Sequence, residues 1–298
     1  MSALATLALW WPLSRALANH AYERGGATFA ALFNFTFDEA RIESAFEWRS
    51  EFRGRAFVLP VLPTSARSWN AARVWRWSGN RAIRSLYEDY LQARPGGVLF
   101  DIGANDGTHT YPFAASGYRC VCFEPQPSCV EYVRLVCARN RFDMVDVEQT
   151  LVMAATARDV EFFVSRSSWY SSVCAANVAR FETPERIRVA AVSLDQYCVE
   201  RGVLPTLVKI DVEGAELEVL RGARKVIHAV LPDLFVEVSS DEDNKRRVWE
   251  LLAPEGYRCF QVDHLARERR PIGALKAFLG AGRSAPNADF LFLTRTDI

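Results

Sequence analysis

From residue 97 to the C-terminus, short apolar runs alternate with stretches of helical length, and this alternation limits the fold more than any other feature. Strands that alternate with helices in this way are typical of a mostly parallel sheet with helices on both faces. The pattern therefore predicts an α/β fold built on a doubly wound sheet. The apolar runs, in chain order, are VLFDI (98–102), YRCVCFE (118–124), VDVEQTLVM (145–153), TLVKID (206–211) and LFVEV (234–238).

The order of the strands in space follows from how parallel strands are connected. Because crossovers between parallel strands are right-handed, the strands at 98–102, 118–124 and 206–211 are expected to lie side by side. Two later runs, at 257–262 and 289–294, are suited to an antiparallel hairpin at the edge of the sheet. We therefore expect a mostly parallel sheet that ends in this hairpin.

Further elements are indicated by local signals. DVEFFV (159–164) and RIRVAAV (186–192) predict an inserted pair of strands before the fourth strand. A serine followed three residues later by Glu or Gln is a capping box, and such boxes occur at Ser128 and Ser193. We expect a helix to begin at each box, and Gly202 to end the second helix.

Residues 1–96 contain no glycine loop of the kind that binds phosphate. They are predicted to form an N-terminal extension of helices around a β-rich piece, FRGRAFVLPVLP (52–63). The Pro-Gly-Gly break at 95–97 separates this extension from a second domain over residues 97–298. We expect the extension to act as a cap or a substrate-recognition region.

The start of the chain is apolar, but the run is too short to span a bilayer and contains Pro12. Leu4, Leu7 and Trp11 fall on one face of a helix, which predicts a helix packed on the domain. A membrane-surface helix and a signal peptide are the alternatives, although the positively charged start of a signal peptide is missing.

The charges are balanced, since Lys and Arg together number 36 and Asp and Glu also number 36. A chain that binds nucleic acid through its phosphates usually has a basic excess, so nucleic acid is not expected as a partner. The seven cysteines include no C-x-x-C pair, and several lie in apolar runs, which indicates buried thiols. This usage is typical of a reducing compartment and predicts a cytoplasmic protein.

The most informative segment is DIGANDGT (101–108), which lies between a buried strand and a helix. Gly103 and Gly107 allow the backbone to turn sharply and to approach a ligand closely. The spacing G-x-x-x-G lacks the middle glycine of the G-x-G-x-x-G loop that binds a dinucleotide pyrophosphate. It therefore suits a ligand without a pyrophosphate, such as the amino-acid end of S-adenosylmethionine (SAM).

Glu124 ends the second predicted strand, about 20 residues after the first glycine, where an acid accepts hydrogen bonds from ribose hydroxyls. Its two carboxylate oxygens match a vicinal diol. Asp101, the glycine loop and Glu124 together predict a site for an adenosine ligand at the carboxyl edge of the sheet.

The segments VLFDIGANDGTHT, FEPQP, LVKIDVEGAELEVLRGA and VEV resemble the FkbM family of methyltransferases in order and spacing. The resemblance covers about residues 95–298 and is most specific in KIDVEGAE (209–216). It implies the seven-stranded, Rossmann-like class I methyltransferase fold, SAM as methyl donor, and O-methylation of a sugar or natural product. The residues that match the family's motifs are Gly103, Asn105 and Gly107 in the cofactor loop, Glu124 as the ribose acid, and Asp211 and Glu213 in the acidic motif after the fourth strand.

Methyl transfer to a hydroxyl is helped by a base that is positioned beside the acceptor. Asp211 follows the fourth strand, in the crevice where ligands of such sheets lie, and is the first candidate. His109, in the first turn after the glycine loop, and Glu237, near the end of the fifth strand, are the other catalytic candidates. Glu213 is assigned to cofactor binding, with an acid that stabilises a helix start as the alternative.

Three further expectations concern the surroundings of this site. Asp211 and Glu213 could share a divalent cation, but the motif has no evident His or third acid, so no metal is expected. Lys209 alternates with apolar neighbours and is expected to form a structural ion pair. The Ser-Ser-Trp-Tyr segment at 167–170 is a candidate lining of the acceptor pocket, with a surface loop as the alternative.

Two other functions stay open at this point. A nicotinamide-dependent oxidoreductase or epimerase shares the strand, glycine loop and acid, but would carry G-x-G-x-x-G and usually Tyr-x-x-x-Lys, which the sequence lacks. A non-catalytic adenosyl-binding module would be marked by a broken loop or a missing acid, and both are intact. The expected partner is a small-molecule or saccharide acceptor, and a homo-oligomer is left open.

Overall fold

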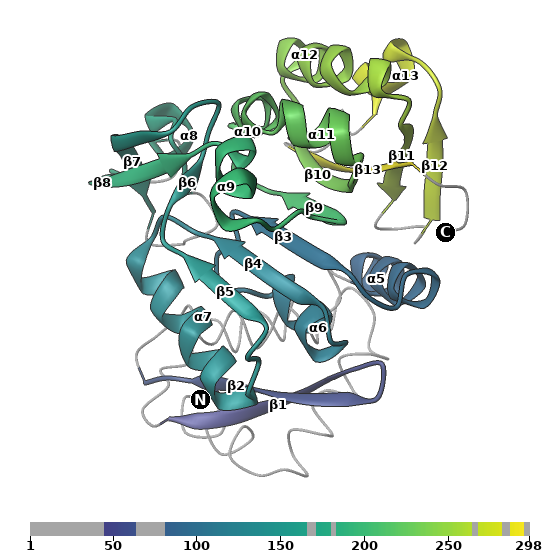
Figure 1. Ribbon diagram of the computed structural model, residues 1–298. Helices are drawn as coiled ribbons and strands as arrows, with labels where there is room; N and C mark the ends of the chain where they lie inside the picture. The colour runs from purple at the N-terminus through teal and green to yellow at the C-terminus, as the bar shows by residue number, and fades with distance from the viewer. Residues whose placement is uncertain are drawn as a thin grey trace, which may run out of the picture.

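The computed structural model describes residues 45–63, 81–165, 171–179, 183–263, 268–281 and 287–294 (Figure 1). The helix expected to contain Leu4, Leu7 and Trp11 lies outside these residues, as do the pocket candidates at 167–170. Within the described ranges, no helix combines the length and the apolar character needed to cross a membrane.

The central sheet has eight strands in the part of the chain that the structure describes. They are β3 (Val98–Ile102), β4 (Arg119–Phe123), β5 (Val145–Glu148), β9 (Leu207–Ile210), β10 (Asp233–Ser239), β11 (Arg258–Asp263), β12 (Glu268–Ile272) and β13 (Asn287–Leu293). Their order in space is β12-β11-β13-β10-β9-β3-β4-β5. The strands from β10 to β5 are parallel, so the first, second and fourth apolar runs lie side by side as predicted.

The topology confirms the predicted fold class. With β12 set aside and the other strands counted along the chain, their order is 3-2-1-4-5-7-6, in which the chain winds outward in both directions from β3 and β9. The seventh of these strands, β13, is antiparallel to both of its neighbours. This is the doubly wound, Rossmann-like sheet of the class I methyltransferase fold, and sheets of this kind bind ligands where the strand order reverses.

The predicted edge hairpin is wrong in its position. β11 does pair with β13, but β13 lies between β10 and β11, and β12 forms the edge of the sheet. The sequence of β12, ERRPI, has no apolar run, because an edge strand that is largely exposed needs none. Local patterns therefore missed this eighth strand.

The predicted third strand, at 145–153, is split between two sheets. β5 continues the central sheet, whereas β6 (Leu151–Val152) pairs in parallel with β8 (Glu185–Val192). β7 (Ala157–Val164) pairs with β8 in the antiparallel sense, which confirms the predicted inserted pair. We call this three-stranded sheet, with the short helix α8 (Ala175–Ala179), the inserted sheet.

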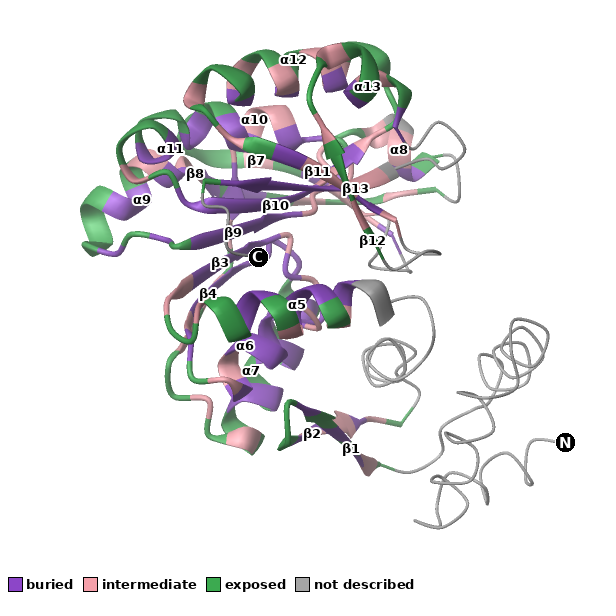
Figure 2. Cartoon of the chain, turned by 90° about the vertical axis from the view of Figure 1, so that its right-hand side faces the viewer, coloured by how far each residue is buried: buried purple, intermediate pink, exposed green. Residues whose placement is uncertain are grey.

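Helices cover both faces of the central sheet (Figure 2). Side chains that alternate along each strand therefore enter two cores: Leu99 of β3 lies in one, and Phe100 lies in the other. The first face carries α5 (Arg81–Ala93), α6 (Thr110–Ala115) and α7 (Pro127–Asn140). The second carries α9 (Leu194–Arg201), α10 (Glu216–Gly222), α11 (Arg224–Val230), α12 (Glu242–Leu252) and α13 (Leu275–Gly280).

The two predicted capping boxes have different outcomes. Ser193 is the N-cap of α9, its side chain accepts the N–H of Gln196, and Gly202 ends the helix in a left-handed conformation. The box at Ser128 is wrong, because α7 already begins at Pro127. Proline suits the first turn of a helix, where its missing N–H would have no partner.

The N-terminal extension contains a hairpin of β1 (Phe46–Phe52) and β2 (Arg55–Val61). Arg53 and Gly54 both have positive φ, 49° and 74°, as in a two-residue type I′ turn. The hairpin lies against α6 and α7, and its buried side chains belong to the same core as those helices (Figure 1). This part of the extension therefore packs directly on the α/β domain.

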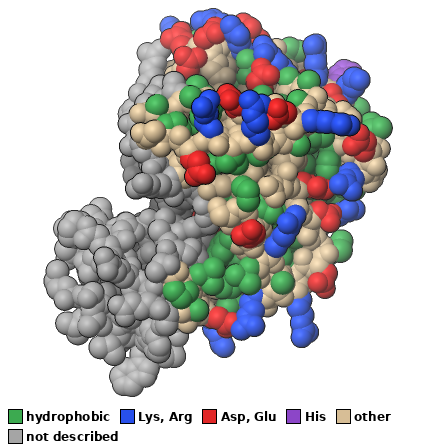
Figure 3. All heavy atoms as spheres, turned by 90° about the vertical axis from the view of Figure 1, so that its left-hand side faces the viewer, with side chains coloured by type: hydrophobic (Ala, Val, Ile, Leu, Met, Phe, Trp, Pro, Cys, Tyr) green, Lys and Arg blue, Asp and Glu red, His purple; other side chains and the backbone are tan. Residues whose placement is uncertain are grey.

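The side chains agree with two inferences from composition. All seven cysteines are free thiols, and six of them are buried. Among the described residues on the face shown in Figure 3, acidic and basic side chains are interspersed. This distribution matches the balanced charge of the sequence.

Candidate active site

The glycine loop after β3 lies at the carboxyl edge of the sheet, where the strand order reverses. Gly103, Asn105 and Gly107 have φ angles of 75°, 50° and 73°, so left-handed backbone bends the loop. A Cβ atom at Gly103 would lie 1.8 Å from the backbone oxygen of Asp211. Glycine is thus required because this loop touches the loop after β9, and that contact brings the predicted cofactor loop beside the acidic motif.

Asp101 lies beneath the glycine loop and is fully buried. Its Oδ2 accepts the hydroxyl of Thr110 at 2.6 Å, and its Oδ1 is 3.7 Å from Nζ of Lys209. Burial raises the pKa of this carboxyl, and the Lys209 ammonium and the Thr110 hydroxyl oppose that rise. Asp101 therefore joins β3, α6 and β9, and its assignment to cofactor binding stays a prediction.

Glu124, directly after β4, orders the same loop. Its Oε2 accepts the N–H of Asn105 and its Oε1 accepts the N–H of Gln126, both at 2.8 Å. With 5% of its surface exposed, Glu124 is buried at the end of the strand. A carboxylate offers about four acceptor positions, so the same group can hold the loop and accept ribose hydroxyls. The remaining acceptor positions of Glu124 thus fit the ribose hydroxyls of SAM, and the ribose assignment stays a prediction.

The charged groups of the site lie on one face of the sheet. Asp101, Lys209 and Glu237 each stand two positions after a buried apolar residue of the core beneath α5 and α6. Asp101 and Lys209 are also direct partners in the register of β3 and β9. The alternation that builds the apolar core therefore places acids and an ammonium together where the strands end.

Lys209 forms the structural ion pair that was predicted. It is 4% exposed, and its Nζ donates a hydrogen bond to Oδ2 of Asp211 at 3.0 Å. Burial alone would lower the pKa of the ammonium, but Asp211 and Asp101 raise it by more. Lys209 is therefore a fixed positive charge between two carboxyl groups.

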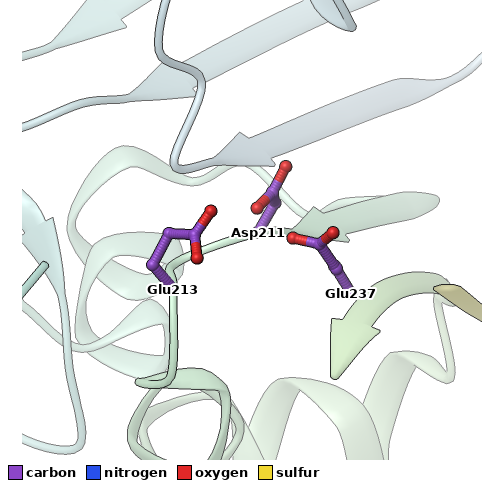
Figure 4. A group of neighbouring side chains, drawn as sticks. All are labelled: Asp211, Glu213 and Glu237. Atoms are coloured by element: carbon purple, nitrogen blue, oxygen red, sulfur yellow. The ribbon is translucent and has the colours of Figure 1, made fainter. Parts of the chain in front are cut away.

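Three carboxyl groups, those of Asp211, Glu213 and Glu237, converge at this edge of the sheet (Figure 4). Asp211 and Glu213 lie in the loop between β9 and α10, and Glu237 comes from β10. One oxygen of each lies within 4.8 Å of the corresponding oxygens of the other two. Asp211 and Glu237, two of the catalytic candidates, are thus brought together with Glu213, which was assigned to cofactor binding.

Asp211 and Glu237 share one proton. Burial opposes ionisation of Asp211, but Lys209 and a hydrogen bond from Glu237 lower its pKa, so this group is a carboxylate. The charge of Asp211, together with burial, raises the pKa of Glu237, which keeps its proton and donates a hydrogen bond to Asp211. At neutral pH the site therefore holds a carboxylate, a carboxylic acid and an ammonium in contact.

His109 is the N-cap residue of α6, and its Nδ1 is 2.8 Å from the hydroxyl of Tyr87. Burial lowers the pKa of the imidazole to about 3, with a further lowering by Lys209 and an opposing effect of Asp211. The imidazole is therefore neutral, and burial is the main cause. Its interaction with Asp211 places the third catalytic candidate at the same site.

Two residues of the site were not found from the sequence. Tyr87 comes from α5, is buried and binds His109. Asp289 is paired with Glu237 in the register of β10 and β13, and it adds to the effects of Asp211 and burial on the pKa of Glu237. Asp289 lies near the start of β13, opposite Glu237 near the end of β10, so knowledge of the strand pairing would have indicated it. Tyr87 gave no signal, since it lies in the extension.

Asp211, Glu213 and Glu237 are also the described residues that could hold a metal ion. One reason for expecting no metal is therefore wrong, because β10 supplies the third acid that the KIDVEG motif lacks. The absence of a metal stays a prediction. The ammonium of Lys209 and the proton on Glu237 already offset negative charge at this place.

Comparison with known proteins gives one family. The model of the Methyltransferase FkbM domain matches residues 101–259, which include the glycine loop and every acid described above except Asp289. A curated relative, the hexuronic acid methyltransferase AglP of Haloferax volcanii, is 28% identical over 186 residues, which cover 58% of this chain and 69% of that protein.

Two of the solved structures that this chain resembles are also methyltransferases. The methyltransferase FkbM of Methylobacillus flagellatus KT aligns with a TM-score of 0.40 at 15% identity and covers 67% of this chain. This chain spans 44% of that one. A SAM-dependent methyltransferase from Agrobacterium tumefaciens gives a TM-score of 0.42 at 8% identity, covering 83% of this chain and 69% of that chain.

The fold, the glycine loop and the acids at the switch point define a SAM-dependent methyltransferase domain of class I. The chain belongs to the FkbM methyltransferase family, whose model matches more than half of it. SAM is accordingly the cofactor of this domain, and the resemblance seen in the sequence is confirmed.

Proposed function

We propose that this protein transfers the methyl group of SAM to a hydroxyl oxygen of a sugar. The observation that carries the proposal is the cluster of Asp211, Glu213 and Glu237, which lies directly beside the glycine loop through the contact of Gly103 with Asp211. Carboxylates are strong acceptors for the hydroxyl groups of a sugar. The similarity to a hexuronic acid methyltransferase supports a saccharide as the acceptor class.

On the cofactor side, we assign SAM to the loop of Gly103, Asn105 and Gly107 and to Glu124. SAM supplies a methyl group from a positively charged sulfur, and the sulfur keeps the electrons of the bond that breaks. Glu124 accepts hydrogen bonds from the ribose hydroxyls. Its carboxylate also accepts the backbone N–H groups of Asn105 and Gln126, and these hydrogen bonds hold the loop in shape. Asp101 supports the loop from below through Thr110.

On the acceptor side, we assign the proton of the sugar hydroxyl to Asp211. This carboxylate is held by Lys209 at 3.0 Å and by the proton of Glu237, so its orientation is fixed before the acceptor binds. As the oxygen bonds to the methyl carbon, its O–H group becomes strongly acidic, so even a carboxylate of low pKa can take the proton. His109 and Glu237 are the alternatives for this role.

Titration calorimetry tests the cofactor assignment. We expect the purified protein to bind SAM and not NAD, and the opposite result would restore the oxidoreductase alternative. Transfer from SAM with a labelled methyl group then tests the acceptor, with methyl glycosides of neutral sugars and of hexuronic acids as probes. Mass spectrometry should find the label on oxygen. Binding of SAM without transfer to any of these saccharides would contradict the proposal and favour a non-catalytic module.

A further inference from the structure

The inserted sheet reaches the acidic cluster through two side chains that the methyltransferase motifs do not include. The hydroxyl of Ser172 donates to the backbone oxygen of Glu213 at 2.9 Å. The side-chain amide of Asn177, in α8, donates to the same oxygen at 2.8 Å. Two side chains of one inserted segment therefore converge on a single carbonyl of the acidic loop.

The backbone at this carbonyl has a conformation that needs support. Glu213 has a φ of 51°, a left-handed value that residues with a Cβ adopt only rarely, and Gly214 follows with 100°. A Cβ at position 214 would lie 2.8 Å from Nδ2 of Asn177. The glycine of the KIDVEG motif thus leaves room for the asparagine that holds the residue before it.

The donors themselves are fixed in place. Ser172 is 1% exposed, and it forms an isolated bridge with Phe163 of β7 through two backbone hydrogen bonds of 2.9 and 3.0 Å. Its hydroxyl also accepts the N–H of Cys174 at 3.0 Å. Ser172 therefore connects β7 of the inserted sheet to the backbone of Glu213 through hydrogen bonds.

We propose that Ser172 and Asn177 are positioning residues that hold the carboxylate of Glu213 within the acceptor site, so that the inserted sheet forms one wall of that site. The inference rests on the proposed function, because it concerns the same three carboxyl groups. Glu213 lies in the loop between β9 and α10, and without these two donors its left-handed turn can relax. The carboxylate of Glu213 then moves away from Asp211 and Glu237.

The first test separates acceptor binding from cofactor binding. In the full chain, Asn177→Leu keeps a side chain of similar size and removes the donor, and Ser172→Ala removes the other donor. We expect the double variant to lose about 10–100-fold in kcat/KM for the sugar acceptor, as for the loss of one or two buried hydrogen bonds. Its affinity for SAM should be unchanged. Arg188→Ala is the matched control, since Arg188 lies in the inserted sheet and its ion pairs with Asp159 and Glu161 are exposed.

The second test needs no acceptor, so it stands even if the proposed sugar substrates fail. Asp211 and burial contribute most to the raised pKa of Glu237, and Glu213 adds to it. Carbon-13 NMR of the Glu237 carboxyl should therefore show a lower pKa in the single variant Asn177→Leu, and a larger fall in the double variant. An unchanged pKa in folded variants, or an equal loss in the Arg188→Ala control, would overturn the proposal. Failure of the wild type to methylate sugars would overturn only the proposed function.

Discussion

At the scale of single residues, Glu124 shows how a ligand-binding acid can also be part of the structure. The sequence suggested that Glu124→Gln would weaken SAM binding and leave stability unchanged. The structure contradicts the second half, because both carboxylate oxygens accept backbone N–H groups, and the first half stays a prediction. A glutamine would place its amide N–H against one of these donors.

We therefore predict two effects of Glu124→Gln. The affinity for SAM should fall about 10–100-fold, because charged hydrogen bonds to the ribose are lost. The free energy of unfolding should also fall by about 1–3 kcal/mol, because one buried N–H loses its acceptor. Calorimetric titration and chemical denaturation measure the two quantities. Glu131→Gln, at an exposed position of α7, is the control, and equal SAM affinity of both variants would remove Glu124 from the cofactor site.

Asp211 is the residue for which we expect the largest loss of turnover. Asp211→Asn should reduce kcat by about 10²–10⁴-fold, the usual contribution of a general base, with SAM affinity nearly unchanged. Steady-state kinetics and calorimetry together measure this. Normal turnover of the variant would make His109 or Glu237 the better candidate, and loss of SAM binding would move Asp211 to the cofactor side.

His109 should make stability depend on pH in a defined window. Its pKa falls from 6.5 to about 3 on folding, mainly through burial, so between these values the unfolded chain binds the extra proton. The free energy of unfolding should therefore decrease as the pH is lowered from 6.5 towards 3. Denaturation over this range should show a shallower dependence in His109→Gln than in the wild type. Identical slopes would mean that His109 is not buried as the neutral imidazole.

At the scale of elements, the sequence was informative where a signal is local. Apolar runs located the parallel strands, and the glycine spacing excluded a pyrophosphate loop, because both depend on neighbouring residues. Strand pairing depends on distant residues, so the position of β13 between β10 and β11 and the contact of Asp289 with Glu237 were not predicted. The same reason explains Tyr87, which reaches His109 from a helix assigned to another region.

The acidic cluster is formed by the loop after β9 and by β10, and its charges lead to a prediction about metals. The ammonium of Lys209 and the proton on Glu237 offset two of the three negative charges that Asp211, Glu213 and Glu237 would otherwise carry, without a metal ion. A divalent ion would have to displace that proton and overcome repulsion by a buried ammonium. We therefore expect dialysis against EDTA to leave turnover unchanged. A loss of activity that added Mg²⁺ or Mn²⁺ restores would contradict this expectation and identify the three acids as ligands.

At the scale of the whole molecule, the N-terminal hairpin of β1 and β2 packs on the α/β domain. Asn140, at the end of α7, accepts the N–H of Val58 at 2.6 Å and donates to its carbonyl at 2.7 Å, as a neighbouring strand would. Phe57 and Leu59 of the hairpin are at most 2% exposed and share a core with Val133 of α7. The boundary drawn at residue 96 therefore separates segments that share one hydrophobic core.

We predict that the hairpin and the α/β domain unfold together. Leu59→Ala should lower the free energy of unfolding by about 2–5 kcal/mol, the usual effect of emptying a fully buried leucine site. Because the cavity opens in the core shared with α7, the whole chain should still unfold in one transition, at a lower denaturant concentration. Fluorescence and circular dichroism followed in the same titration test this, with Glu51→Ala at an exposed hairpin position as the control. A variant in which an early, separate transition appears while the main one stays in place would show that the hairpin folds independently, and would favour the domain boundary that the sequence suggested.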